Sequence, residues 1–526
     1  MNRLITSLIV VLATANLSAQ QMTELPKLVV GITVDQLRSD YLQYLYNAFG
    51  EKGFKRLMQN GIIYENVNFD FNNPDRASAM AAIFSGTYPF QHGIISNSFF
   101  NPATLRVESI LNDPRFMGNS TTETLSPASI LTSTFCDELK IASAGTSRIY
   151  SFAPNSDQAI IGAGHSANGA FWIDNKNGKW ATSTYYKDFP YYLDRLNRTE
   201  GLDKRIDDLE WEPMLPVSSY KFIPYFASEW SFKHSFGKLK KDKYEYFKSS
   251  ALVNDEINKA VELFLKEEKQ NTKQSPDFLS VSYNAAPYKG GNEQEYALEV
   301  QDTYIRLDDN IAKLLDAIDK TVGLNNAVVF LASTGCTSNE ALPSTIYDIP
   351  TGEFHPSRCC ALLNTYLMAL YGADNWVSGY DNQQIYLDRK LIENKKIDIN
   401  EIQTKAAEFV IQFAGVQDVV TSHQLLHGNW NEHIKQYRNG YHRKLSGDLI
   451  LSLQPGWQIV FDDISYDNIS VRNDVIPSPF IIFRPNLKAE RISRPIDATE
   501  IAPTISRILR IRSPNACSSL PLAEIK

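Results

Sequence analysis

Short apolar runs rich in β-branched residues alternate along the chain with segments whose apolar residues recur at helical spacing. The run from Leu28 to Val34 has no break, which is typical of a strand buried on both faces of a sheet. It ends at Asp35, and a helix is expected to follow through residues 54–58 and to stop at Gly61. The pattern predicts a buried first strand with a polar residue at its carboxyl end.

A strand–helix–strand unit is predicted in the middle of the chain. Phe278 to Tyr283 and Ala327 to Ala332 have the composition of central strands. Between them, apolar residues from Leu307 to Ile318 lie at helical spacing, with charged residues off the apolar stripe. This alternation favours an α/β fold, in which a mixed, mostly parallel sheet carries helices on both faces.

The predicted core is divided by inserted segments. Two shorter strands and a final helix are expected at Ile459 to Phe461, Pro479 to Phe483 and Ile501 to Ile511. The core is therefore predicted in three pieces, at 27–180, 250–345 and 450–521. The stretches 181–249 and 350–449 are predicted cap or insert segments.

The N-terminus has the pattern of a cleaved signal peptide. Arg3 precedes an apolar stretch from Leu4 to Ala13, and Leu17 to Ala19 resembles a cleavage site. We expect a signal peptide over 1–19, a folded domain over 20–526 and an exported protein, periplasmic or extracellular. The apolar stretch is shorter than the ~20 residues of a membrane span, and no later segment is long and apolar enough to form one.

Composition and charge limit the classes of partner that the protein can bind. The 526 residues have a mass of 59.4 kDa, are 43% hydrophobic and carry a net charge of −8 with a pI near 5.6. This content can fill a large core, and the charge offers no basic surface for nucleic acid. An unknown protein or a small molecule of the cell envelope is the expected partner.

Five cysteines are present, so an exported chain would keep at least one thiol outside any intramolecular disulfide. The adjacent pair Cys359 and Cys360 is interpreted as two buried reduced thiols, with a vicinal disulfide as the alternative. The other three are Cys136, Cys336 and Cys517.

Five segments, in order, resemble motifs of the alkaline phosphatase superfamily, with the monoesterase and nucleotide phosphodiesterase branch as the best match. They are Val29 to Tyr41, Phe84 to Ile94, Ala163 to Trp172, Ser446 to Trp457 and Pro495 to Thr504. The resemblance implies a fold of this family with inserted caps. It also implies two zinc ions, held by carboxylates and imidazoles, and a Thr or Ser nucleophile that a metal activates.

The positions that match the family's reactive residues are largely substituted. Asp35 fills the first ligand position, but the residue aligned with the nucleophile is Arg76, whose guanidinium stays protonated. Ser78 lies two residues away and is expected to point elsewhere.

The remaining ligand positions also differ from the family's pattern. The second zinc site aligns with Pro287 and Gly291, and the family's adjacent Asp-His aligns with Ser333 and Thr334. The last histidine ligand aligns with Tyr466. Hydroxyls are weak zinc ligands beside carboxylate and imidazole, so the resemblance implies a site without its metals.

The groups that would neutralise a phosphoryl oxygen are altered as well. The family's Lys and Arg positions read Asn155 and Asp157, which would repel a phosphate dianion. Asn97 alone keeps the amide of its family counterpart. We expect Arg76 to pair with Asp35 or Asp157 and so to replace the missing metals by one fixed cation.

The histidines are interpreted as structural or solvated residues. His165 lies in a fold motif and is expected to form structural hydrogen bonds. His423, His427, His433 and His442 gather in the second insert, where a metal site is the alternative.

Two hypotheses follow for function. The first is a non-catalytic protein with an alkaline phosphatase fold, without a cofactor, whose cleft or surface serves binding or assembly. The alternative is an active phosphomonoesterase or phosphodiesterase that uses Asp35, zinc held by ligands outside the motif, and Ser78 as nucleophile.

Overall fold

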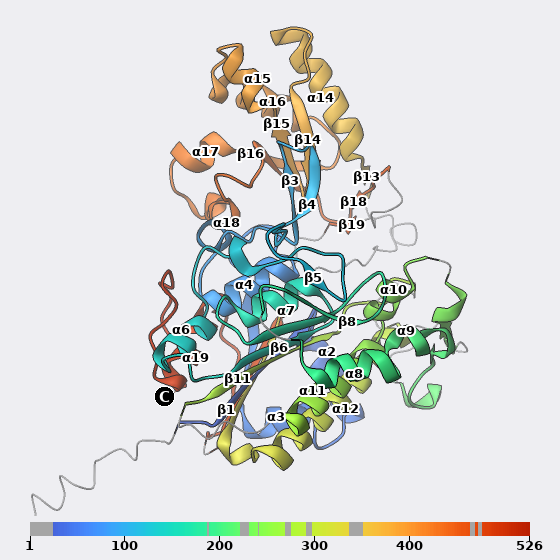
Figure 1. The fold of residues 1–526 in the computed structure, drawn as a ribbon. Coiled ribbons are helices and arrows are strands. Elements are labelled where there is room, and N and C mark those ends of the chain that lie inside the picture. The colour runs from blue at the N-terminus through green and yellow to red at the C-terminus, as the bar shows by residue number, and fades with distance from the viewer. Residues whose placement is uncertain are drawn as a thin grey trace, which may run out of the picture.

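The computed structural model describes residues 25–186, 189–220, 231–239, 241–268, 275–290, 297–335, 351–462, 469–471, 476–485 and 487–525. An 11-stranded mixed sheet forms the centre of the molecule (Figure 1). Along the sheet its strands are β21 (Glu490–Ile492), β2 (Ile62–Asn68), β20 (Ser478–Phe483), β12 (Ala327–Ser333), β1 (Leu28–Asp35), β11 (Asp277–Asn284), β6 (Ile149–Ala153), β7 (Gly169–Ile173), β8 (Trp180–Ser183) and β5 (Gly118–Asn119), with β22 (Ile496–Asp497) paired to β2. The five strands from β12 to β7 are parallel, and β20, β8 and β5 are antiparallel to their neighbours.

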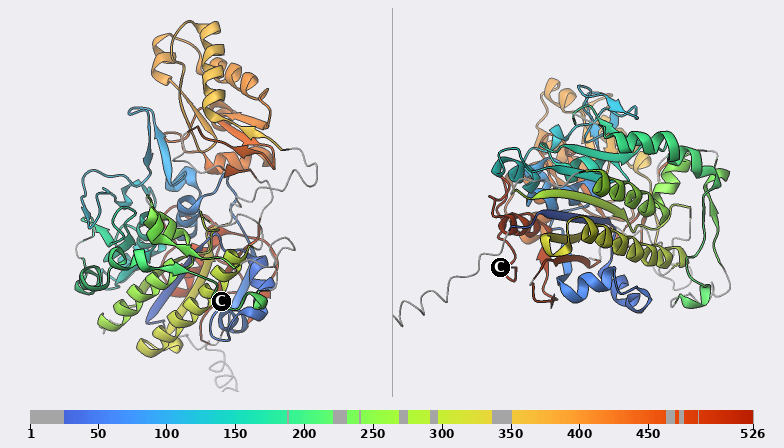
Figure 2. Two further views of the ribbon diagram at one scale, coloured as in Figure 1. Left: turned by 90° about the vertical axis from the view of Figure 1, so that its right-hand side faces the viewer. Right: turned by 60° about the horizontal axis from the view of Figure 1, so that its bottom comes forward.

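Helices cover both faces of this sheet (Figure 2). Val30 and Ile32 of β1 pack in one apolar cluster, whereas Val29 packs in the other, because successive side chains of a strand point to opposite faces. The first cluster contains helices α2 (Ser39–Tyr44), α3 (Phe54–Asn60), α8 (Tyr191–Glu200), α11 (Leu252–Glu267) and α12 (Leu298–Thr321). The second contains α4 (Arg76–Ser85), α6 (Phe135–Ala142), α7 (Ser156–Ala163) and α19 (Ile501–Leu509).

The structure confirms the predicted elements of the core. Strands β1, β11, β12 and β20 and helices α3, α12 and α19 lie where the apolar patterns placed them. Gly31 of β1 leaves room for a neighbouring ring, since a Cβ there would approach the Cζ atom of Phe330 to 2.5 Å. The mixed, mostly parallel α/β fold is therefore established.

Short elements surround this core. Beside it lie α5 (Pro89–His92) and the hairpin of β3 (Ser98–Asn101) and β4 (Arg106–Ser109). The first inserted segment also contains α9 (Leu202–Arg205), α10 (Lys243–Ser249), β9 (Glu210–Trp211) and β10 (His234–Ser235). Single 3₁₀ turns occur at Tyr46–Ala48, Pro127–Ser129, Ile206–Asp208, Val217–Ser219, Phe236–Lys238, Leu324–Asn326 and Ala498–Glu500.

The second inserted segment builds its own layer, at the top of Figure 1. Its main sheet, in the order β14-β15-β17-β16, consists of β14 (Val377–Asp381), β15 (Gln384–Leu387), β17 (Leu449–Leu453) and β16 (Val416–Thr421). A smaller sheet consists of β13 (Glu353–Phe354), β18 (Gln458–Ile459) and β19 (Ile469–Ser470). Its helices are α14 (Pro356–Tyr371), α15 (Arg389–Asn394), α16 (Ile399–Val410), α17 (Ser422–His427) and α18 (Glu432–Gly440).

This arrangement corrects one prediction. The apolar run Ile459 to Phe461 does not give a strand of the central sheet, because β18 pairs with β13 of the inserted segment. Likewise, β17 pairs with β15 and β16, so the inserted sheet continues past residue 449. Short apolar runs fit either sheet, and only the pairing partner decides between them.

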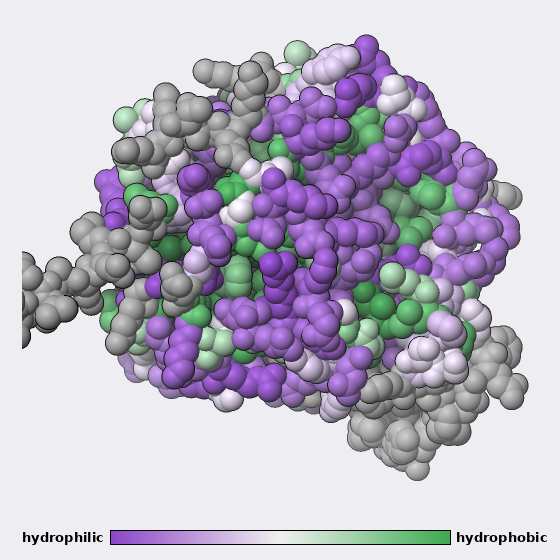
Figure 3. All heavy atoms as spheres, turned by 90° about the horizontal axis from the view of Figure 1, so that it is seen from below, coloured by the Kyte–Doolittle hydropathy of each residue, from purple (hydrophilic) through white to green (hydrophobic). Residues whose placement is uncertain are grey.

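Viewed from below, the molecule shows a mainly hydrophilic surface with scattered apolar residues (Figure 3). No helix in the described ranges has the length and apolar character needed to cross a bilayer.

Cys359 and Cys360 are both free thiols, and Cys359 is buried, so the vicinal disulfide is not formed. Cys136 and Cys517 are also free, and Cys336 lies outside the described residues.

Candidate functional site

The carboxyl ends of three parallel strands meet at one edge of the sheet. Asp35 ends β1 and is paired in register with Asn284 at the end of β11, and Val34 is paired with Ser333 at the end of β12. The next residue, Thr334, donates its hydroxyl hydrogen to Asp35 Oδ1 over 2.8 Å. This edge is where ligands bind in open α/β sheets, and it brings together three of the residues that the sequence singled out.

Arg76, in the first turn of α4, binds the carboxylates at this edge. Its Nε and Nη2 atoms donate to the two carboxylate oxygens of Asp157 over 2.7 and 3.1 Å. Its Nη1 atom donates to Asp35 Oδ2 over 3.3 Å. The Arg76 side chain is 25% exposed, compared with 9% for Asp35 and 13% for Asp157. The expected pairing of Arg76 is confirmed, and it engages both carboxylates at once.

The electrostatic balance favours the charged guanidinium. Burial by itself would lower the pKa of Arg76, but attraction to Asp157 and then to Asp35 outweighs burial and raises the pKa overall. Two-point binding of a carboxylate matches the fork of a guanidinium, which an ammonium group would not match.

Ser78 is not placed to act as a nucleophile in this structure. It is fully buried at the third position of α4, and its hydroxyl donates to Asp75 Oδ1 over 2.7 Å. Asp75 is the N-cap residue, and its side chain also accepts the backbone N–H of Ser78. The pair forms a capping box, so the hydroxyl serves to begin the helix.

The remaining candidates have local partners. Asn155 is the N-cap residue of α7 and donates its side-chain amide to Gln158 over 3.0 Å. The backbone N–H of Asn97 donates to Asp75 Oδ2, while its own side-chain oxygen is buried without a partner among the described residues. Ser333 donates its hydroxyl to the carbonyl oxygen of Leu37.

Two charged residues near this site were not anticipated. Lys248 of α10 is buried and donates to the carbonyl oxygen of Ile173 and to Asn175. Its burial, and then the nearby charge of Arg76, lower its pKa to about 8. Asp381, at the end of β14, has its pKa raised to about 6 by burial and then by the charge of Asp75. No sequence signal marks either residue, because each comes from an insert that only the fold brings near Arg76 or its neighbour Asp75.

Three comparisons identify the fold family. Residues 29–470 match the family model of type I phosphodiesterase / nucleotide pyrophosphatase. The chain belongs to this family. A protein of Myroides odoratus named calcium-transporting ATPase is 31% identical over 532 residues, or 96% of each chain. Alkaline phosphatase PafA of Elizabethkingia meningoseptica is 28% identical over 522 residues, covering 95% of this chain and 94% of that protein.

A solved structure agrees with this assignment. The crystal structure of wild-type alkaline phosphatase PafA superposes with a TM-score of 0.83 at 26% identity, covering 96% of this chain and all of that one. The type I phosphodiesterase / nucleotide pyrophosphatase fold, within the alkaline phosphatase superfamily, therefore extends over nearly the whole chain.

The described residues at the strand ends do not fit a pair of zinc ions. Both carboxylate oxygens of Asp35 accept hydrogen bonds, from Thr334 and from Arg76. Pro287 offers no side-chain donor, and the hydroxyl of Ser333 is engaged by backbone groups. Over the described ranges, no three His, Cys, Asp or Glu residues come together as a metal-binding group. Zinc needs several such ligands at about 2.0–2.2 Å, which this set does not supply.

The other predicted positions have different outcomes. Gly291 and Tyr466 lie outside the described residues, so their alignment with metal ligands stays a prediction. His165 is a structural residue as predicted, because its two ring nitrogens contact Asp137 at 3.0 Å and the carbonyl oxygen of Ile130 at 2.9 Å.

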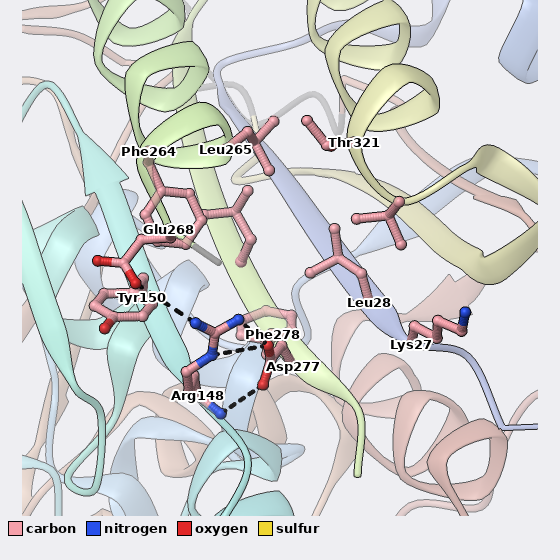
Figure 4. A pocket seen from close by; sticks show the side chains of 12 residues that line it. Lys27, Leu28, Arg148, Tyr150, Phe264, Leu265, Glu268, Asp277, Phe278 and Thr321 are labelled. Atoms are coloured by element: carbon pink, nitrogen blue, oxygen red, sulfur yellow. Dashed lines mark hydrogen bonds and ion pairs between the residues drawn. The ribbon is translucent and has the colours of Figure 1, made fainter. Parts of the chain in front are cut away.

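A cavity of about 50 Å³ lies at the opposite, amino-terminal end of the same strands (Figure 4). Arg148 crosses it, donating to Asp277 from its backbone and side chain and to Glu268 over 3.5 Å. Typical ligand pockets measure about 300–1,000 Å³, so this space is suited to a few waters at most. The strand-end cluster around Arg76 therefore stays the candidate site.

Replacing Arg76 by alanine should destabilise the fold. Removing one partner from a mostly buried ion pair leaves the carboxylates of Asp157 and Asp35 uncompensated, and the expected loss is about 3 kcal/mol. Thermal and denaturant unfolding would measure it. The matched control is Arg195→Ala, which removes an exposed pair with Glu267 and should cost under about 1 kcal/mol. An unchanged melting temperature together with new zinc binding in the Arg76 variant would refute the structural role.

Asp381→Asn should stabilise the protein at alkaline pH. The carboxyl group binds its proton more tightly in the folded chain, where its pKa is about 6, than in the unfolded chain. Its contribution to stability is therefore present below about pH 4 and is lost as the pH rises through 6. The amide should add roughly 2 kcal/mol at pH 8 and little at pH 4. Melting curves across this range test the sign, and equal effects at both pH values would contradict it.

Proposed function

We propose that this chain is a non-catalytic, exported member of the type I phosphodiesterase / nucleotide pyrophosphatase family. In this proposal, the closed strand-end cluster maintains the fold, while the cleft or the inserted layers bind a protein or small molecule of the cell envelope. The observation that carries the proposal is that Arg76 binds Asp35 and Asp157 together. The motif spacing predicts that this residue stands at the family's nucleophile position.

The chemistry of the side chains at this site supports a non-catalytic protein over an active hydrolase. A guanidinium has no lone pair available to attack phosphorus at neutral pH, and Ser78 is buried within its capping box. The carboxylate at position 157 would also repel a phosphoryl group, whereas a hydrolase must stabilise the negative charge that develops there. Export is supported by the apolar N-terminal stretch that follows Arg3.

A metal and turnover assay tests the proposal directly. The purified mature chain should contain no zinc that depends on Asp35 and should hydrolyse neither p-nitrophenyl phosphate nor its bis-ester above background. Asp35→Ala is the control, since it removes the one carboxylate kept from the family's ligand set. Stoichiometric zinc with turnover that this substitution abolishes would establish the active alternative.

Arg76→Thr should not restore hydrolysis. The substitution returns a hydroxyl to the nucleophile position, but the ligands that would activate it are still absent. Arg76→Ala is the matched control, since both variants lose the ion pairs and only one gains the hydroxyl. Both should show background phosphatase activity after circular dichroism confirms folding. Hydrolysis by the threonine variant above that of the alanine variant would show that a functional metal site survives.

A further inference from the structure

Helix α17 in the second insert is short but firmly anchored. Thr421 caps its N-terminus and exchanges hydrogen bonds with Gln424, so the first turn is fixed by a capping box. Gln403 of the adjacent helix α16 donates to Ser422 over 2.8 Å and accepts the backbone N–H of His423 over 3.1 Å. These contacts hold the first turn in place against the neighbouring helix.

The other end of α17 is held by Arg438 of α18. Its guanidinium donates to the carbonyl oxygens of Leu425 and Gly428 over 2.8 and 2.6 Å. It also stacks over the ring of Trp430 at 5.0 Å. Side chains on the exposed face of α17 therefore project from a fixed backbone.

Two histidines occupy one face of this helix. His423 and His427 are four residues apart, and their ring centroids are 4.7 Å apart with an interplanar angle of 41°. His427 is exposed and His423 is partly buried. Within the described part of the chain, neither imidazole has a hydrogen-bond partner at its ring nitrogens. Their lone pairs are thus available to a ligand that approaches from solvent.

We propose that His423 and His427 form a two-imidazole chelate for a transition-metal dication. Histidines at positions i and i+4 of a helix face the same side and can bind one metal together. Imidazole suits copper, nickel and zinc, and the usual order of affinity places Cu²⁺ above Ni²⁺ and Zn²⁺. Water completes the coordination, since no third His, Cys, Asp or Glu of the described residues joins the group. This site lies apart from the cluster around Arg76 and does not depend on the proposed function.

Two electrostatic effects act on this chelate. His427 lies in the last turn of α17, where the partial negative charge of the helix end favours a cation. Arg438 binds the same helix end and opposes a dication there. Metal binding also requires neutral imidazoles, so protons compete with the metal and the affinity should fall as the pH is lowered.

Titration with the metal ions themselves tests the site. The mature chain, without a polyhistidine tag, is titrated calorimetrically with Cu²⁺ and Zn²⁺ at slightly alkaline pH. One site is expected, tighter for Cu²⁺, with electron paramagnetic resonance showing two imidazole nitrogens on the copper. His427→Asn and His423→Asn should each weaken binding by about tenfold or more, because one of two ligands is lost. His433→Asn is the matched control and should leave the affinity unchanged, since its ring pairs with Asp418.

Three outcomes would overturn the proposal. They are the absence of binding, an unchanged affinity in both His423→Asn and His427→Asn, and a copper spectrum without two nitrogens. In the first two cases, the rings of His423 and His427 only pack against each other and bind no metal. Binding that survives the histidine substitutions and disappears in Asp35→Ala would place the metal at the strand ends, and would contradict the proposed function as well.

Discussion

The guanidinium of Arg76 lies between two carboxylates at the end of the first strand, and the rest of the site is arranged around it. Asp157 accepts two hydrogen bonds from it and Asp35 accepts one, while Thr334 satisfies the other oxygen of Asp35. Carboxylates this poorly exposed need a nearby positive charge or they destabilise the fold. A permanently charged side chain supplies that charge from within the chain, at a place where the family's pattern implies bound metal.

The scaffold and the chemistry of the strand-end site depend on different interactions in this molecule. The chain, which contains the sheet and the helices on both of its faces, superposes on a solved alkaline phosphatase structure with a TM-score of 0.83. Those features depend on buried apolar contacts, which tolerate changes at a polar edge. The reactive positions depend on a few lone pairs and protons, so a handful of substitutions alters them without disturbing the core.

The inserted segments add charges to this edge that the core does not contain. Lys248 enters from the first insert and lies within electrostatic range of Arg76, and Asp381 enters from the second within range of Asp75. Burial lowers the pKa of Lys248 and raises that of Asp381, so it disfavours the charged form of each side chain. The second insert also carries the two histidines of α17, of which His427 is exposed and His423 is partly buried.

The sequence alone determined strands β1, β11, β12 and β20, helices α3, α12 and α19, and the family, while the substituted motif positions stay a prediction. Unbroken apolar runs such as Leu28 to Val34 are long enough to specify a strand, and motif spacing is local information that aligns Arg76 with a nucleophile. Tertiary structure alone decided that Arg76 binds both carboxylates and that β18 joins the inserted sheet. It alone brought Lys248 near Arg76. Contacts between segments far apart in the chain depend on how sheets pair and helices pack, and short or isolated polar residues carry no local pattern that encodes their partners.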